Sequence, residues 1–259
     1  MKKKKNNFNL DMKINKTLIT FLFFSLIYSN IKVYGQPDAE QLLVKMDDVV
    51  FATKDKSSNI KMVMINQKSG KEKTKKAVMM QKGVDMKLFR YTFPKSDSGI
   101  ATLSLPNNEI YLYLPLFKKP KKITNLAEKN AFNQSDFSVS DMATKSYADN
   151  FTAELVSTNE YTYVVDLKPK SDESSYSHLV VYINKEYLYP EQFDYYNKKN
   201  QMIKKATYNY TKIDNYWISD EVSMEDLKKD HKTTIYMSDI KINQGLKDEL
   251  FTLENLAGK

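Results

Sequence analysis

The spacing of hydrophobic residues changes once along the chain, near residue 59. Before that point apolar residues recur every three or four positions, which is the spacing of one helix face and predicts a helix over residues 37–53. That face consists of Leu42, Leu43, Met46, Val49 and Val50. After residue 59, short runs rich in valine, isoleucine, tyrosine and threonine are separated by turn residues, which is typical of an antiparallel meander.

Two groups of strands are predicted, with a break in the alternation between them. The first group covers residues 59–66, 74–81, 85–93, 100–105, 109–114 and 121–124. The second group covers residues 151–157, 160–167, 178–184, 192–197, 202–212, 216–224 and 233–242. Residues 125–150 are predicted to form a loop with short helices, in which Ser138 and Asp141 have the spacing of a capping box. Residues 246–256 are predicted to form a short closing helix or turn.

Several predicted strands are apolar on both faces, notably "KMVMI" at residues 61–65 and "IYLYL" at residues 110–114. A strand with one solvated face should place a polar residue at every second position, so we expect a covering segment or a ligand on the second face. Two other strands alternate cleanly enough to predict a buried face. These faces are Tyr161, Tyr163, Val165 and Leu167 on one strand, and Leu179, Val181 and Ile183 on the other.

Residues 1–35 have the pattern of an export signal. Four lysines near the start precede the apolar run "LITFLFFSLIY" at residues 18–28, which is shorter than the ~20 residues that a membrane-spanning helix needs. We expect cleavage near Gly35, with an uncleaved anchor as the alternative. The remaining residues, 36–259, are enough to bury one substantial core, and we expect them to form a single domain.

The charge of the chain lies mostly in this leader. Residues 1–35 hold seven lysines and one aspartate, a net charge of +6 out of +8 for the whole chain, which leaves +2 for residues 36–259. Arg90 is the only arginine, so the side chain that proteins favour for reading bases and gripping phosphates is nearly absent. A nucleic-acid partner is therefore not expected. The sequence contains no cysteine, which excludes both disulfides and a lipid-modified cysteine.

Residues suited to catalysis are sparse. His178 and His231 are the only histidines, and neither has a second metal-ligating residue at a suitable spacing. Carboxylate pairs occur at 47–48, 172–173 and 225–226, in polar segments that we expect to be exposed. We therefore predict a binding protein with no catalytic residue, metal or cofactor, and not an enzyme.

Two segments carry a family resemblance. "EIYLYLPLFKKPKKI" at residues 109–123, followed by "NQSDFSVSDM" at residues 133–142, resembles the outer-membrane lipoprotein-sorting proteins of the LolA-like superfamily. Other matching pieces follow in the same order, from "AEQLLVKMDDVVF" at residue 39 to the closing strand and turn that end at residue 256. The chain departs from the family pattern at Gln134, where glycine is usual, and at Val139 and Ser140, where the family has a Tyr-Glu pair.

The resemblance implies a mainly β (α+β) fold: an incomplete, strongly curved antiparallel β-barrel whose concave face is covered by a few helices and encloses an apolar cavity. It also implies a soluble periplasmic carrier that shields lipoprotein acyl chains or other lipid without catalysis. An inner-membrane transporter and an outer-membrane acceptor are the partners to consider, and a monomer is expected. The alternative is a non-carrier envelope protein that uses the same scaffold to contact a transporter or sensor, with its cavity closed by side chains.

The candidate lipid contacts come from three parts of the chain, and for each the alternative is plain core packing. They are the strand residues Tyr111, Leu112, Tyr113 and Leu114, the lid residues Phe132, Phe137 and Met142, and the deeper pair Tyr163 and Val165. Which face of the 110–114 strand lines the cavity is open, because both faces are apolar. The residues Lys118, Lys119, Lys121 and Lys122 are candidates for a positive rim that faces a partner or an anionic surface, together with lysines at residues 68–76. The alternative is that these lysines protect strand edges from aggregation.

Overall fold

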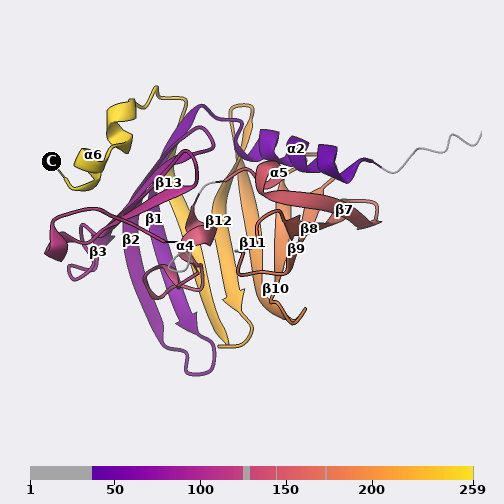
Figure 1. The fold of residues 1–259 in the computed structure, drawn as a ribbon, viewed down its shortest axis with the longest axis horizontal. Coiled ribbons are helices and arrows are strands. Elements are labelled where there is room, and N and C mark those ends of the chain that lie inside the picture. The colour runs from indigo at the N-terminus through magenta and orange to yellow at the C-terminus, as the bar shows by residue number, and fades with distance from the viewer. Residues whose placement is uncertain (1–36, 125–128, 144, 173, 259) are drawn as a thin grey trace, which may run out of the picture. The chain divides into compact units, whose positions relative to one another are not determined.

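A thirteen-stranded antiparallel sheet, strongly curved but not closed, carries the fold (Figure 1). The computed structural model describes residues 37–124, 129–143, 145–172 and 174–258. They belong to one unit that starts at Pro37, and the predicted export signal lies outside the described residues. The predicted half-barrel architecture is confirmed.

The strands follow one another along the sheet in an order that is broken once. From one edge to the other the order is β6-β5-β4-β3-β2-β1-β13-β12-β11-β10-β9-β8-β7, so that β1 pairs with the last strand of the chain. The first six strands are β1 (Asp55–Asn66), β2 (Glu72–Lys82), β3 (Met86–Phe93), β4 (Ala101–Leu105), β5 (Glu109–Tyr113) and β6 (Lys121–Lys122). The other seven are β7 (Phe151–Thr158), β8 (Thr162–Pro169), β9 (His178–Asn184), β10 (Pro190–Tyr196), β11 (Met202–Ile213), β12 (Tyr216–Asp226) and β13 (His231–Ile242). Each predicted strand is present, with ends that differ by a few residues.

Helices cover the concave face. The predicted first helix is α2 (Ala39–Val50), which begins where the Asp38 side chain accepts a hydrogen bond from the Glu40 amide. It contacts β7, β12 and the short helix α5 (Tyr147–Asn150). The predicted capping box is confirmed, because Ser138 and Asp141 bond reciprocally at the start of α4 (Val139–Met142). Figure 1 shows α4 in front of the central strands of the sheet.

The apolar character of both strand faces has a physical explanation in β3 to β5. On the concave face, Phe89 belongs to the main core together with Leu43 and Met46 of α2. On the convex face, Leu88 and Leu103 pack against Phe251 and Leu256. The segment that covers this second face is therefore the C-terminal one, which contains the 3₁₀ turn η4 (Asp248–Phe251) and α6 (Leu253–Leu256), coloured yellow in Figure 1.

Polar contacts hold the C-terminal segment in place. The carboxylate of Asp55 accepts hydrogen bonds from the backbone amides of residues 244, 245 and 246 at 2.8, 2.8 and 3.1 Å. Gly245 has a φ of +73°, a conformation that residues with a Cβ rarely adopt. Arg90 Nη2 donates to the carbonyl oxygens of Asn255 and Leu256 at 2.8 and 3.2 Å. The only arginine thus serves to hold the end of the chain.

Two predictions about burial are wrong. Tyr161 was assigned to a buried strand face but is 69% exposed, because β8 begins only at Thr162 and the Asn159 side chain holds residues 161 and 162 in a turn. The carboxylate pairs were expected to be exposed, yet Asp47 and Asp226 are buried. Asp47 accepts hydrogen bonds from Ser146 and the Ala148 amide, and thereby joins α2 to α5. Of the other residues predicted to lie on the buried faces of β8 and β9, Tyr163 is half-buried and the rest are buried.

Candidate functional site

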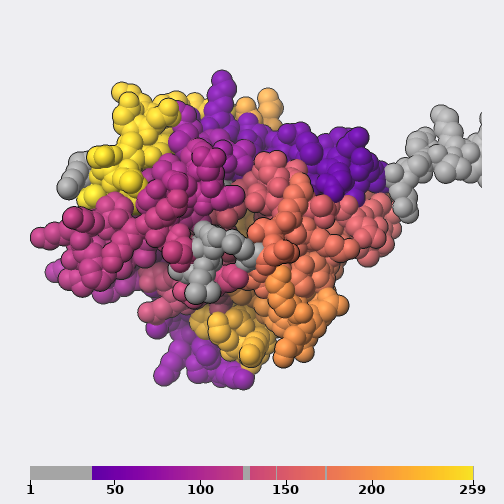
Figure 2. All heavy atoms as spheres, in the orientation of Figure 1, coloured from indigo at the N-terminus to yellow at the C-terminus, as the bar shows by residue number. Residues whose placement is uncertain are grey.

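A cavity of about 500 Å³ lies between the concave face of the sheet and the segments that cover it. Its outer wall is built from the β4–β5 turn, the residues after β6, and the two segments around residues 140–151 and 169–176. Its inner wall comes from the sheet, through Leu179, Tyr195 and Tyr208. Figure 2 shows the face of the molecule on which the magenta, pink and orange segments that form these walls meet.

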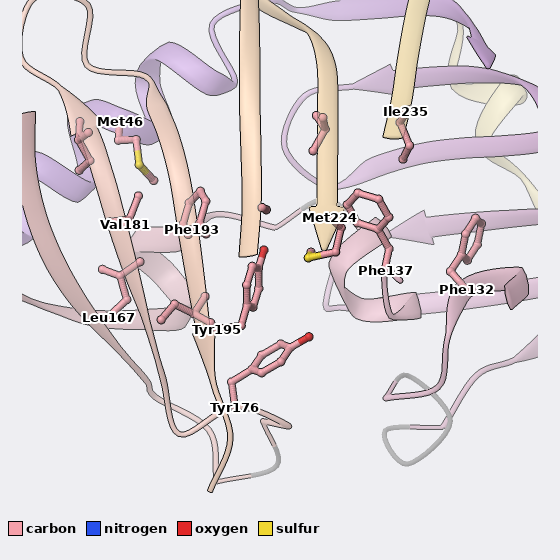
Figure 3. Close-up of a cluster of buried hydrophobic side chains, with 14 of the residues drawn as sticks. Met46, Phe132, Phe137, Leu167, Tyr176, Val181, Phe193, Tyr195, Met224 and Ile235 are labelled. Carbon is pink, nitrogen blue, oxygen red and sulfur yellow. The ribbon is translucent and has the colours of Figure 1, made fainter. Parts of the chain in front are cut away.

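Tyrosines dominate the inner part of this cavity. Tyr147 is stacked on Phe193, with ring centroids 5.0 Å apart, and the ring centroids of Tyr176 and Tyr195 are 4.9 Å apart. Figure 3 shows Tyr176 and Tyr195 side by side. Burial raises the pKa of Tyr208 to about 12 and raises the pKa of the other three tyrosines well above their usual range. Their hydroxyls therefore stay protonated near neutral pH and offer hydrogen bonds within an otherwise aromatic wall.

One buried cluster of charged groups reaches the cavity. The Tyr176 hydroxyl donates to the Asp141 carboxylate at 3.1 Å, and Lys204 Nζ lies 3.4 Å from the same carboxylate and 3.3 Å from the Tyr176 oxygen. The Asp141 side chain is only 7% exposed. This cluster ties α4 to β11 and compensates the buried charge, because each charged group has a partner.

A smaller cavity of about 140 Å³ lies next to the first and is mostly apolar. The two share Phe137, Asp141 and Tyr208 as lining residues, so Phe137 stands at the boundary between them. The rest of the smaller cavity is lined by Ile60, Met79, Lys87, Phe89, Met142, Val222, Ile235 and Met237. Figure 3 shows Phe137 near Met224 and Ile235, which belong to the same buried cluster.

Two lysines on the concave face lie in buried surroundings that disfavour their charged form. Lys56 and Lys87 flank Gln81 in the register of β1, β2 and β3. Lys87 Nζ donates to the Met142 carbonyl oxygen at 2.7 Å. Burial lowers the pKa of both lysines to about 8, and repulsion from Lys56 contributes to the lowering at Lys87.

The predicted lid residues lie where the cavities meet the core. Phe137 lines both cavities and Met142 lines the smaller one. Phe132 is buried in the main core, edge-on to Phe89 and stacked on Tyr91. The deeper pair does not line either cavity: Val165 is fully buried in the core, and Tyr163 lies half-buried beneath Lys185.

The register of β5 shows which of its faces points inward. Leu112 pairs with Thr102, which pairs with Phe89 of the main core, so Leu112 is on the concave face. Tyr111 and Tyr113 pack instead with the convex cluster beneath the C-terminal segment. Leu114 is half-buried at the end of the strand. None of these four side chains lines either of the two cavities.

The predicted lysine rim divides into separate parts. Lys122 lines the larger cavity and is hydrogen-bonded to Glu109. Lys118, Lys119 and Lys121 are exposed in or beside the turn before it. The second lysine group is largely engaged elsewhere, since Lys75 is buried and pairs with Asp97 at 2.7 Å, and Lys68 pairs with Asp230.

Sequence reasoning missed most residues of the larger cavity. Four tyrosines of its lining come from separate elements: Tyr147 from α5, Tyr176 from the loop before β9, Tyr195 from β10 and Tyr208 from β11. Lys129 and Lys145 lie at the outer wall. Alternation can place Tyr195 and Tyr208 on the concave face of the sheet, but it cannot indicate where the segments that cover this face leave a cavity.

Both histidines make contacts that help to hold the fold together. His231 Nδ1 lies 2.6 Å from Asp136 Oδ2, which also accepts a hydrogen bond from Thr233, so this network fastens the middle segment to β13. His178 stacks on Tyr196. Within the described part of the chain, no three histidine or carboxylate side chains are grouped as metal ligands would be.

The comparisons place this chain in a known structural class. A family model described as "Uncharacterized protein" matches residues 83–258, more than half of the chain, so the chain belongs to that family. No curated protein matches the sequence. Several solved structures share the fold, which confirms the fold that the LolA-like resemblance implied.

Three of these structures cover nearly the whole described unit. A Vibrio parahaemolyticus domain named for outer membrane lipoprotein sorting has a TM-score of 0.78 at 20% identity, covering 85% of this chain and 98% of its own. A DUF1329 family protein from Desulfovibrio piger has a TM-score of 0.76 at 25% identity, covering 84% and 97%. A LolA superfamily protein from Nitrosomonas europaea has a TM-score of 0.72 at 19% identity, covering 85% and 100%. No helix in the described residues has the length and apolar character to cross a bilayer.

Proposed function

We propose that the chain is a periplasmic carrier that shields an acyl chain of a lipoprotein or another lipid in the larger cavity. The observation that carries this proposal is the space of about 500 Å³ between the concave face and its cover. It falls in the range of roughly 300–1,000 Å³ that is usual for small-molecule sites. The Vibrio parahaemolyticus domain, which shares this fold, is named for lipoprotein sorting, and this supports the same function.

The lining of this cavity fits an amphiphile better than a pure hydrocarbon. The inner wall is formed by Phe137, the tyrosine rings and the aliphatic side chain of Leu179, and would bury an acyl chain. The outer wall carries Asn150, Ser171 and the lysines, which would meet a polar or anionic headgroup. A carrier of this kind needs no catalytic group, and the function we propose includes no chemical step.

The alternative, an envelope protein that uses the scaffold only to contact a transporter or sensor, would be favoured by an interior filled with side chains. The larger cavity is instead open enough for a ligand, and the smaller one continues it toward the core. Both cavities therefore favour the carrier.

Displacement of a fluorescent fatty-acyl probe tests the proposal. Ala143 lines the larger cavity, so Ala143→Trp should fill part of it and weaken probe binding at least tenfold. Ala52 is exposed at the end of α2, and Ala52→Trp is the matched control that should bind like the wild type. Lipid that co-purifies with the protein from the periplasm, identified by mass spectrometry, gives an independent measure. A protein that carries no lipid and binds no probe would refute the carrier function.

A further inference from the structure

An exposed apolar turn stands beside β5. It is the 3₁₀ turn η2 (Pro115–Phe117), in which Leu116 is 85% exposed and Phe117 is 52% exposed. A single exposed apolar residue needs no explanation, but two large adjacent ones at the apex of a turn are uncommon on a soluble surface. We call residues 115–121 the tip.

The tip is held in shape by its own backbone. The Phe117 amide donates to the Leu114 carbonyl oxygen at 2.9 Å, and the turn ends at Lys118, whose φ is +54°. Pro115 packs against the neighbouring turn so closely that a Cβ on Gly99 would lie 3.1 Å from its Cγ. Leu116 and Phe117 are therefore presented to solvent by an ordered turn and need little further ordering to bind.

Positive charge surrounds the two apolar side chains. Lys118, Lys119 and Lys121 are exposed, and the Nζ atom of Lys121 lies 4.8 Å from the centre of the Phe117 ring. Among the described residues none of these three lysines forms an ion pair, in contrast to Lys122, which is bonded to Glu109. The tip thus combines an apolar apex with uncompensated lysines.

We propose that the tip docks on a lipid bilayer with anionic headgroups, with Leu116 and Phe117 inserted at the interface and the lysines among the headgroups. Leucine and phenylalanine beside lysines are the combination that binds anionic membrane surfaces, because apolar burial and electrostatic attraction add. Edge-strand protection would explain the lysines alone, but it does not explain the exposure of Leu116 and Phe117.

The tip is connected directly to the cavity wall. β6 pairs with β5 and leads from the tip to Lys122 and Ile123, which line the larger cavity. Five residues of β5 span about 17 Å, so docking through the tip brings the cavity within that distance of the membrane surface. This link to cargo transfer rests on the proposed carrier function, whereas the docking itself does not.

Vesicle sedimentation tests the docking. Wild-type protein should bind vesicles of phosphatidylcholine with about 30% phosphatidylglycerol, bind pure phosphatidylcholine vesicles weakly, and lose binding as salt rises. Leu116→Ser with Phe117→Ser should weaken binding at least tenfold, and Lys118→Gln with Lys119→Gln at least threefold. The matched controls are Val156→Ser, at a 60% exposed site on β7, and Lys198→Gln with Lys199→Gln, in an exposed turn; both should bind like the wild type.

A fluorescence measurement separates insertion from surface adsorption. Trp217 is the only tryptophan, so Phe117→Trp in a Trp217→Phe background places the only indole at the tip. Its emission should shift to shorter wavelength with anionic vesicles. Binding without a shift would overturn insertion, and tip variants that bind vesicles like the wild type would assign the tip to a protein partner instead.

The probe-displacement assay on the same variants distinguishes the two proposals. Tip variants should still bind the acyl probe. Vesicle binding through the tip by a protein that binds no probe would leave the docking standing and refute the carrier function.

Discussion

Replacing Phe137 by alanine should change the length of acyl chain that the protein prefers. Phe137 lines both the larger and the smaller cavity, and its ring stands at their boundary. Its removal should join the two spaces, so that a chain held in the larger cavity could extend toward Ile60 and Met79.

The size of the gain follows from the smaller cavity. Its volume of about 140 Å³ has room for about four groups of ~30 Å³, the share of one water molecule and close to the size of a methylene. Each buried methylene contributes about 0.8 kcal/mol, so the upper limit is about 3 kcal/mol. Because the acyl chain should fill the smaller cavity only in part, we expect roughly half of this binding free energy. That is about 1.4 kcal/mol, which corresponds to a tenfold gain in affinity.

The assay is displacement of the fluorescent probe by fatty acids of increasing length. The variant should bind the longer chains at least tenfold better, relative to shorter ones, than the wild type does. Loss of a buried phenylalanine should also lower the free energy of unfolding by about 3–5 kcal/mol. Phe251→Ala is the control, because Phe251 is equally buried but lies in the convex cluster, where the same substitution should cost stability without changing length preference. Identical length profiles in wild type and Phe137→Ala would refute the reasoning.

Three further predictions concern stability. Lys56 and Lys87, with pKa values near 8 against an ordinary 10.5, bind fewer protons in the folded state than in the unfolded chain between those values. The free energy of unfolding, measured with urea, should therefore rise by up to about 1.4 kcal/mol per lysine per pH unit above pH 8, until the buried tyrosines, with raised pKa values, reverse the trend above about pH 10. Lys87→Met should reduce the rise, and a flat profile in the wild type would contradict the assignment. Burial raises the pKa of Asp47 despite its two hydrogen bonds, so Asp47→Asn should be neutral or stabilising, whereas Asp47→Ala should lower the free energy of unfolding by about 1–3 kcal/mol. Tyr113→Ser should lower the melting temperature by opening the convex cluster and leave probe binding unchanged; weaker probe binding would show that the strand faces are assigned the wrong way round.

The secondary structure was predictable because local patterns determine it. The helix face around Leu43 and Met46, the alternation in β9, and the capping box at Ser138 are all readable from spacing alone, and all are confirmed. The predicted burial of Tyr161 is wrong because periodicity does not indicate where a strand starts. Here the turn at Asn159 sets the start of β8. The predicted exposure of Asp47 is wrong because its hydrogen-bond partners, Ser146 and Ala148, are about a hundred residues further along the chain.

The site was less predictable than the fold. Phe137 was found through a motif in the middle segment, and the motif carried the information that alternation lacked. Tyr176 and Asp141 are 35 residues apart, and their contact depends on how two irregular segments lie over the sheet. Alternation along "IYLYL" could not assign its faces, because the C-terminal segment that covers Tyr113 lies more than a hundred residues further on.

The pairing of β1 with β13 has a consequence for how the protein is made. Lys56 is paired with Ile242, so the centre of the sheet joins the first strand to the last. Pairings of such long sequence separation form slowly, because the entropy of closing the loop must be lost before the contacts are gained. The sheet cannot be completed until nearly the whole chain has been synthesised. For a chain that is threaded across a membrane before it folds, as the predicted export signal implies, this order of events is an advantage, because the complete sheet cannot form early enough to block its passage.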